Sequence, residues 1–170
     1  MNPALRDGLL FQLGWFCCVA GGNRGALLAA VVLVPLQATW PGRRSTSEWR
    51  MLLLFAAVGL AMDLGWQALG VLAFKGQLLW STPGWLVVLW LMFAGTLFRS
   101  LAFLQDRLVL AAVLGALSGP LSYMAGIRLG AAQSAHPDSV IALAMAPAWA
   151  ILLPLFACLA RGRKTAGASS

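Results

Sequence analysis

Long apolar runs separated by short polar breaks make up almost the whole chain. A helix needs about 20 residues to cross the hydrocarbon core of a bilayer, and most of these runs approach or exceed that length. The pattern predicts an all-α, polytopic membrane bundle of about six transmembrane helices. The six apolar segments are 8–22, 26–40, 51–74, 82–104, 108–132 and 139–160.

The first two segments are the shortest. Each has about 15 residues, which is short of a comfortable crossing. The glycine-rich break at 21–25 between them predicts a tight helical hairpin. Two interpretations stay open: both arms cross the membrane, or the hairpin is re-entrant. In either case the chain returns to its starting side, so the orientation of the later segments does not depend on the choice.

Positive charges predict which side of the membrane each loop faces. Lys and Arg are enriched in cytoplasmic loops. If the N-terminus is cytoplasmic, the loops on the outer side of the membrane carry only Arg24 and Lys75. Both termini are therefore predicted to be cytoplasmic. Residues 1–160 then form one membrane domain, and residues 161–170 form a disordered basic tail. The cations assigned to the inner side are Arg6, Arg43, Arg44, Arg50, Arg107, Arg161, Arg163 and Lys164.

Composition supports this class and excludes others. The chain is 61% hydrophobic and only 10% charged, whereas a soluble domain carries about 25% charged residues. The net charge of +7 is spread singly or in small groups between the apolar segments. It does not form the basic stripe of a nucleic-acid-binding protein. Membrane lipids are the expected partners, and no nucleic acid is expected.

Catalytic and metal-binding signatures are missing from the sequence. There is no HExxH, GxSxG or CxxC motif and no phosphate-binding loop. The lone histidine, His136, precedes Pro137 and Asp138, two residues that are typical of a helix start. We therefore assign no catalytic residue, no metal site and no cofactor. An enzymatic activity stays open but is not favoured.

The most informative polar residue is Asp63, which lies in the middle of the segment 51–74. A charged carboxylate near the bilayer centre is costly unless it is paired or faces water. Gly59, Asp63, Gln67 and Gly70 recur at helical spacing and form one small, polar stripe. Two interpretations stay open: the acid locks the bundle together, or it belongs to a ligand-binding site.

The segment 108–132 is the second unusual element. Its small residues form two seams, which let helix backbones approach closely. These are Ser118, Ser122, Gly126 and Gly130 in one seam, and Gly115 and Gly119 in the other. Pro120 interrupts the helix at the depth expected for Asp63 and frees a backbone carbonyl. Transporter sites are commonly built at such breaks near the midplane, and an ordinary proline kink is the alternative.

Two arginines accompany Asp63 within the apolar segments. By helical rise, Arg99 lies roughly 9 Å to the cytoplasmic side of the midplane and Arg128 roughly 12 Å to the outer side. Asp63 can pair with one of them, which leaves one cation over. Because arginine binds carboxylate and phosphate in a bidentate fork, a cavity with this surplus charge predicts an amphiphile with an anionic head. The alternative is that both arginines extend to the headgroups.

Aromatic side chains complete the candidate site. Four tryptophans lie deep in their segments and either pack helices or form an apolar wall for a ligand. These are Trp15, Trp66, Trp90 and Trp149. The full set of candidate ligand-binding residues is Asp63, Trp66, Gln67, Arg99, Ser118, Pro120, Ser122, Tyr123 and Arg128.

Four stretches carry a resemblance to a known family: FQLGWFCCV (11–19), DLGWQALGVLAF (63–74), PGWLVVLWLMFAGTLFRSL (83–101) and GALSGPLSYMAGIRLGA (115–131). In them the chain resembles small proteobacterial inner-membrane proteins classed as a domain of unknown function. The resemblance implies a multi-pass protein of the bacterial inner membrane. Members are often encoded beside fatty-acid-modifying enzymes, including cyclopropane-synthase-like proteins, which implies a role in lipid modification. Similar proteins have Asn-His where this chain has Phe98-Arg99, so no catalytic residue is transferred.

The leading hypothesis is a protein that binds or translocates a lipid-like or amphiphilic anionic molecule. Asp63, Arg128 and the break at Gly119-Pro120 would form its site. The motivating observations are the shared depth of Asp63 and the break, and the surplus cation.

Two alternatives stay open. One is a non-catalytic scaffold or accessory subunit that docks a lipid-modifying enzyme through the small-residue seams and the arginine-rich loop 41–50. The same seams could join copies of the chain in a homo-oligomer. The other is an intramembrane acid–base enzyme, with Asp63 as the general base beside Tyr123 or Ser122.

Overall fold

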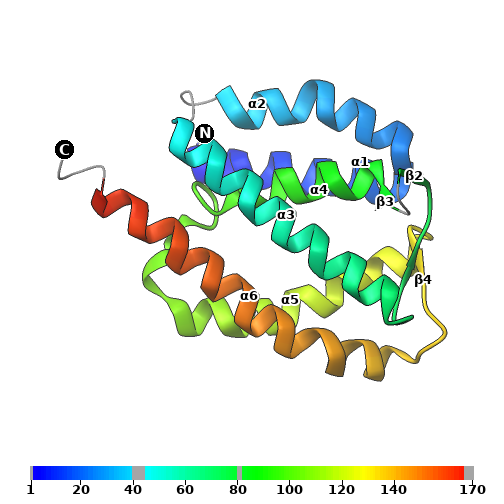
Figure 1. The fold of residues 1–170 in the computed structure, drawn as a ribbon. Helices are drawn as coiled ribbons and strands as arrows, with labels where there is room; N and C mark the ends of the chain where they lie inside the picture. The colour runs from blue at the N-terminus through cyan, green and yellow to red at the C-terminus, as the bar shows by residue number, and fades with distance from the viewer. Residues whose placement is uncertain (1, 40–44, 80–81, 167–170) are drawn as a thin grey trace.

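The computed structural model describes residues 2–39, 45–79 and 82–166, and the side chains of all of these except 77–79 and 163–166. Helices dominate this part of the chain, as the all-α class predicts (Figure 1). They are α1 (Pro3–Leu28), the π-helix η1 (Ala29–Leu33), α2 (Val34–Thr39), α3 (Thr46–Ala68), α4 (Gly84–Thr96), the 3₁₀-helix η2 (Ala102–Asp106), α5 (Leu108–Arg128) and α6 (Asp138–Ala166). Short strands pair β1 (Ala73–Phe74) with β4 (Ala132–Gln133) and β2 (Gln77–Leu79) with β3 (Thr82–Pro83), both antiparallel.

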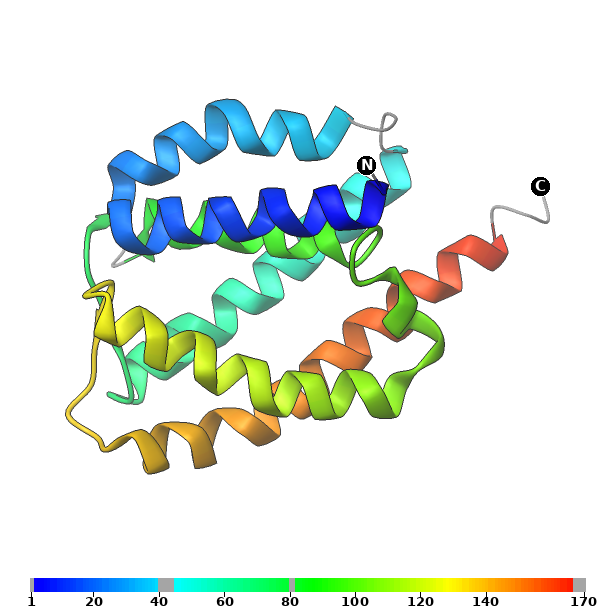
Figure 2. The same ribbon diagram turned by 180° about the vertical axis from the view of Figure 1, so that it is seen from behind.

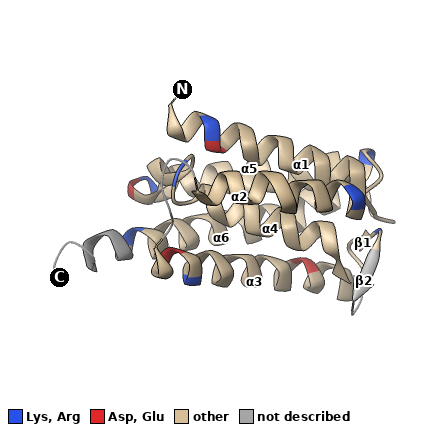
Figure 3. Cartoon of the chain, turned by 90° about the horizontal axis from the view of Figure 1, so that it is seen from above, with Lys and Arg blue, Asp and Glu red and all other residues tan. Residues whose placement is uncertain are grey.

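Length and composition indicate a membrane protein. Four helical segments are long and apolar enough to cross a bilayer: Pro3–Thr39, Thr46–Ala68, Leu108–Arg128 and Asp138–Gly162. Large apolar side chains cover their outer faces, and Val109 and Leu143 are 81% and 78% exposed. Such exposure is unfavourable in water and is expected against lipid. In Figure 3 the charged residues gather toward the helix ends and leave the middles mostly uncharged. The predicted number of about six crossings is not confirmed.

A glycine divides the first of these segments into two arms. Gly22 has φ 55° and ψ −142°, a backbone conformation almost limited to glycine, and the chain reverses there (Figure 2). Residues 3–21, before the reversal, span about 28 Å, close to the thickness of the hydrocarbon core. On the second arm, a Cβ at Gly25 would collide with the carbonyl of Cys17. The hairpin predicted around 21–25 is therefore confirmed, and its arms lie in close contact.

Helix α3 is displaced toward the N-terminus relative to the predicted segment 51–74. It begins at Thr46 because Ser45 and Glu48 form a reciprocal capping box, with hydrogen bonds of 3.2 and 3.1 Å. It ends at Ala68. Asp63 therefore lies about 7.5 Å from the end of its helix by helical rise. The sequence-based placement of this acid at the middle of a helix is wrong.

Helices α3 and α5 end in the same glycine motif. The N–H of Gly70 donates to the carbonyl of Gln67, and the N–H of Gly130 donates to the carbonyl of Ile127, both at 3.0 Å. The next N–H along each chain closes a wider loop at 2.9 Å. Both glycines have positive φ, 72° and 82°, which completes a Schellman motif in each case. Because β1 and β4 follow directly and pair with each other, the ends of the two helices are tied together.

Helix α4 is shorter than the predicted segment 82–104. Regular helix stops at Thr96, and a turn followed by η2 leads into α5. The buried Gln105 stabilises this break because its amide donates to the carbonyl of Leu97 at 2.8 Å. With 13 residues, α4 is about 20 Å long and too short to cross the core alone. Arg99, expected within the apolar helical segment 82–104, lies in this turn.

The helices form two packed groups. Helix α4 packs against α1 and α3, and α5 packs against α6. The start of α1 and the end of α6 lie at one end of the bundle, and the strands lie at the other, here called the strand end (Figures 1 and 2). Helix α6 continues to Ala166, so helix extends into the predicted tail 161–170. Residues 167–170 and the predicted inner-loop cations Arg43 and Arg44 lie outside the described residues.

Candidate functional site

Asp63 is buried where three helices meet. Its side chain is 1% exposed. One carboxylate oxygen, Oδ2, accepts a hydrogen bond from Nε1 of Trp90 on α4 at 2.6 Å. The other, Oδ1, accepts a hydrogen bond from the hydroxyl of Tyr123 on α5. In the described part of the chain Asp63 forms no ion pair, so the predicted pairing with Arg99 or Arg128 is wrong.

The equal endings of α3 and α5 explain why Asp63 meets Tyr123. Each residue lies seven positions before the glycine that ends its helix, Gly70 or Gly130. The β1–β4 ladder holds the two helix ends together, and the hydroxyl of Tyr123 reaches the carboxylate of Asp63. The shared depth of Asp63 and Pro120 stays a prediction, and Gly119, the residue before Pro120, lines the same cavity as Asp63.

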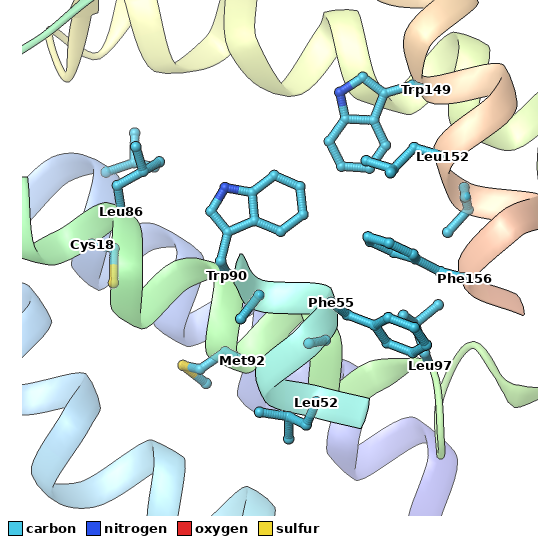
Figure 4. Close-up of a cluster of buried hydrophobic side chains, with 14 of the residues drawn as sticks. Cys18, Leu52, Phe55, Leu86, Trp90, Met92, Leu97, Trp149, Leu152 and Phe156 are labelled. Atoms are coloured by element: carbon cyan, nitrogen blue, oxygen red, sulfur yellow. The ribbon is translucent and has the colours of Figure 1, made fainter. Parts of the chain in front are cut away.

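Two stacked indoles form the centre of the site. Trp90 projects from α4 toward Trp149 on α6 (Figure 4), with ring centroids 5.6 Å apart and planes 10° from parallel. Glycines make room for both rings, because a Cβ at Gly59 would overlap the ring of Trp90 and a Cβ at Gly119 would overlap that of Trp149. Phe93 contacts both indoles edge-on at 5.6 and 5.5 Å. Gly119, which was predicted to let helices pack closely, makes room for one of these rings, and Gly59 of the polar stripe makes room for the other.

These groups border a cavity of about 440 Å³ between the two groups of helices. Its walls come from α1, α3, α4, α5, α6 and the β1–β4 ladder, and eight of its twenty lining residues are aromatic. The lining residues are Phe11, Gln12, Trp15, Val19, Asp63, Phe74, Trp85, Leu86, Leu89, Trp90, Phe93, Ser118, Gly119, Leu121, Ser122, Tyr123, Gly126, Ala131, Ala132 and Trp149.

The mouth of the cavity lies between α1 and α5. Its exposed lining residues all belong to these helices: Gln12, Ser118, Leu121 and Ser122. Across the mouth, Nε1 of Trp15 donates to Oγ of Ser122 at 3.1 Å. The outer faces on either side are apolar and more than half exposed at Leu13, Phe16, Leu117 and Leu121. In a bilayer such faces contact lipid, so the mouth opens sideways toward the acyl chains.

The structure brings together four of the nine candidate residues. Asp63, Ser118, Ser122 and Tyr123 line the cavity, and ligand binding by them stays a prediction. The other five, which do not line it, are Trp66, Gln67, Arg99, Pro120 and Arg128. Arg128 instead donates to Asp138 at 2.8 Å on an exposed surface. Pro120 is buried in α5 beside Gly119.

Sequence reasoning missed several residues near the site and one buried acid. Phe11 and Phe93 line the cavity but carry no signal in a chain this rich in apolar residues. Asp7, which precedes the first apolar segment, is fully buried in α1. Its Oδ2 accepts hydrogen bonds from the hydroxyl and the backbone N–H of Ser100, at 2.7 and 3.3 Å. Only the cost of burying a carboxylate marks such a residue, and hydropathy placed Asp7 outside the membrane segment.

The donors and acceptors of the site suit hydrogen bonding rather than metal binding. Among the residues that the structure describes, no three His, Cys, Asp or Glu side chains are grouped closely enough to hold a metal ion. The polar side-chain groups of the lining residues are one carboxylate, one phenol, two serine hydroxyls, the amide of Gln12 and the indole N–H groups of four tryptophans. A few polar groups on a mainly apolar wall are typical of a site for a small organic ligand.

Comparisons with known proteins give one positive finding. No curated protein and no solved structure matches the chain. One family model, described as "Protein of unknown function (DUF2878)", matches residues 5–155. This range contains every residue that lines the cavity. Because the match covers most of the chain, the protein belongs to this family of unknown function, DUF2878.

Proposed function

We propose that this protein binds a lipid-like, amphiphilic molecule that moves sideways from the bilayer into the cavity between α1 and α5. The observation that carries the proposal is the position of the mouth, which lies between exposed apolar helix faces, while a buried carboxylate lies inside. An apolar tail would then stay against lipid or aromatic wall, and only the polar end would reach Asp63. Carriage of the molecule across the membrane is part of the same proposal.

The size and chemistry of the cavity support a ligand of this kind. Its 440 Å³ falls within the range of about 300–1,000 Å³ that is usual for small-molecule sites. The aromatic walls offer large apolar contact area. Asp63 and Tyr123 offer hydrogen bonds inside it, and Ser122 offers one at its mouth. Both requirements of an amphiphile are therefore met in one space.

The head group in this proposal differs from the anionic head expected from the sequence. That expectation depended on a surplus arginine beside Asp63, but neither Arg99 nor Arg128 lines the cavity. Arg128 is paired with Asp138 at the strand end. A second anion beside the Asp63 carboxylate would meet repulsion in a low-dielectric site. We therefore retain the amphiphile and replace the anionic head by a neutral or cationic one.

The cellular setting is proposed from the charge pattern. Both termini face the cytoplasm, and the protein resides in the bacterial inner membrane. The start of α1 and the end of α6 lie at the same end of the bundle (Figure 1), which supports termini on one side. A lipid-modifying partner enzyme is part of this proposal, although the Arg43 and Arg44 loop that would dock it lies outside the described residues.

One observation favours a second candidate, an intramembrane acid–base enzyme. The hydroxyl of Tyr123 donates directly to the carboxylate of Asp63, and both groups line the cavity. Such a pair can transfer a proton to or from a bound molecule. Turnover of labelled phospholipid by the purified protein alone would support this candidate over a binding protein.

The proposed function is tested by filling the cavity from one glycine. A Cβ at Gly126 contacts nothing within 4 Å, and Gly126 lines the cavity. The Cβ of a leucine there has open space, and we expect the rest of its side chain to occupy ligand space. Gly65 in α3 is the matched control, because its Cβ also contacts nothing within 4 Å and it does not line the cavity.

Native mass spectrometry of the three proteins in nanodiscs gives the readout. We expect wild type and Gly65→Leu to carry the same co-purified amphiphile, and Gly126→Leu to lose it by about tenfold or more, which corresponds to about 1.4 kcal/mol. Equal loading of all three proteins, or only bulk lipid in each of them, would contradict the proposal.

A further inference from the structure

We infer that the cavity selects a cationic head group, an amine or quaternary ammonium attached to an apolar tail. This inference rests on the proposed function and names its ligand class. The inference combines two properties of the same cavity, the sign of its ionisable groups and the orientation of its aromatic rings. Each of them favours a cation independently of the other.

The charge inventory of the cavity is acidic. Its only ionisable lining groups in the described chain are Asp63 and Tyr123, and neither can carry positive charge. No described Lys or Arg side chain lines it. The donors to the Asp63 carboxylate, Trp90 and Tyr123, are neutral. Since charges interact more strongly away from water, a cation in this space is attracted to an anion that no protein cation neutralises.

The carboxylate keeps capacity for a further partner. Each of its oxygens accepts one hydrogen bond in the structure, from Trp90 or from Tyr123. An ionised carboxylate has about four acceptor sites, so about two remain. An ammonium group can use these sites directly. A quaternary ammonium has no N–H, and it would use the field of the carboxylate and the faces of the rings.

The aromatic walls suit the same charge. A cation over the face of Trp or Tyr within about 6 Å of the ring centroid is attracted by the negative charge on that face. Trp149 is stacked on Trp90 and inclined at 62° to Tyr123, whose centroid is 6.4 Å away. All three rings line the cavity beside the buried acid, and the plane of Tyr123 is inclined to that of Trp149. Groups of aromatic rings are the usual receptors for quaternary ammonium ions.

The test compares one tail with three heads. Purified protein in uncharged maltoside micelles is titrated with dodecyltrimethylammonium, dodecanol and dodecanoate, and bound probe is counted by native mass spectrometry. We expect the trimethylammonium probe to bind wild type about tenfold or more tightly than either other probe. We expect Asp63→Asn to lose this preference, because the amide has no charge. It keeps the shape of the side chain and one acceptor oxygen for Trp90, and its NH2 group can donate to the Tyr123 hydroxyl in place of accepting from it.

Two further variants separate charge in the cavity from other effects. Asp7→Asn removes the other buried acid, which lies outside the cavity, and should keep the preference. Asp63→Glu keeps the negative charge and should also keep it. If Asp63→Asn does not fold, as judged by its thermal unfolding, the wild-type comparison of the three probes and the Asp63→Glu result decide the question.

The outcomes distinguish this inference from the proposed function. Equal binding of the three probes, a preference for dodecanoate, or an unchanged preference in folded Asp63→Asn would overturn cation selection and leave an amphiphile site intact. If Gly126→Leu changes the binding of none of the probes, they do not occupy the cavity, and both the inference and the proposed function fail.

Discussion

Glycine and tryptophan act as pairs in this protein. Gly59 on α3 and Gly119 on α5 leave the space that the indoles of Trp90 and Trp149 fill. The stacked rings then carry the Nε1 donor of Trp90 to Asp63. Adding a Cβ at either glycine would therefore displace an indole ring and change the environment of the buried acid. One turn of α3 therefore provides both the space for the ring of Trp90, at Gly59, and the acceptor for its N–H group, Asp63.

Substitution of Gly59 tests this pairing. We expect Gly59→Ala to destabilise the protein by about 1–3 kcal/mol, because its Cβ would force the ring of Trp90 to move in a packed interior. Gly65→Ala on the same helix has open space at its Cβ. It should be neutral or stabilising by up to about 1 kcal/mol, as is usual for Gly to Ala in a helix. Thermal unfolding of both variants in one detergent measures the difference, and similar behaviour of the two would contradict the pairing.

At the residue scale, the sequence predicts the acid and names Tyr123 beside it in one alternative, but it does not predict Trp90 as its second partner. Asp63 stands out because burying a carboxylate in a membrane is costly, and that cost can be seen in one residue. Trp90 and Tyr123 come from two other helices. No spacing rule within a single helix relates them to Asp63. Arg99 and Arg128 were expected as partners because they are the cations within the apolar segments. Arg128 is paired with Asp138 instead.

Helix ends, more than helix middles, determine where the site lies. The paired terminations at Gly70 and Gly130 are tied together by the β1–β4 ladder, and they end the helices that carry Asp63 and Tyr123. Each helix ends at a Leu-Gly pair that is visible in the sequence, Leu69-Gly70 or Leu129-Gly130. Hydropathy passed over them because the residues after each glycine are also apolar, and a hydropathy window does not register backbone conformation. For the same reason, the predicted segment 82–104 included the turn that follows α4 after Thr96.

The reversal within the α1 segment makes a testable prediction about an element. Gly22 has φ 55° and ψ −142°, where a side chain costs about 1–3 kcal/mol of backbone strain. We expect Gly22→Ala to lose that stability by straining or displacing the second arm. The neighbouring Gly21→Ala is the control, because its Cβ contacts nothing within 4 Å and its φ is not positive. Unfolding in a graded series of denaturing detergent compares them, and equal midpoints would show that the reversal does not need glycine.

The cavity exists only in the whole molecule. Helix α1 packs on α4 and α5 packs on α6, so the faces of α1 and α5 that border the mouth belong to different packed groups (Figure 2). Composition predicts a helical membrane protein because it depends on averages over the chain. The space between two groups of helices depends on long-range packing, which periodicity within each helix does not specify. Gly126 was therefore assigned to helix packing alone, yet it lines the cavity together with the candidate residues Ser118 and Ser122.

Orientation in the membrane can be tested at this scale. Lys75 and Arg107 are exposed and lie near opposite ends of the bundle, Lys75 beside the β1–β4 ladder and Arg107 at the start of α5. In a background where Cys17, Cys18 and Cys158 are alanine, a single cysteine is placed at either position. With cytoplasmic termini, an impermeant maleimide should label Lys75→Cys in intact cells and Arg107→Cys only after permeabilisation. The opposite pattern would invert the protein. It would also place the strand end, toward which Asp63 lies, on the cytoplasmic side, so a ligand carried through the cavity would reach the acid from the other face of the membrane.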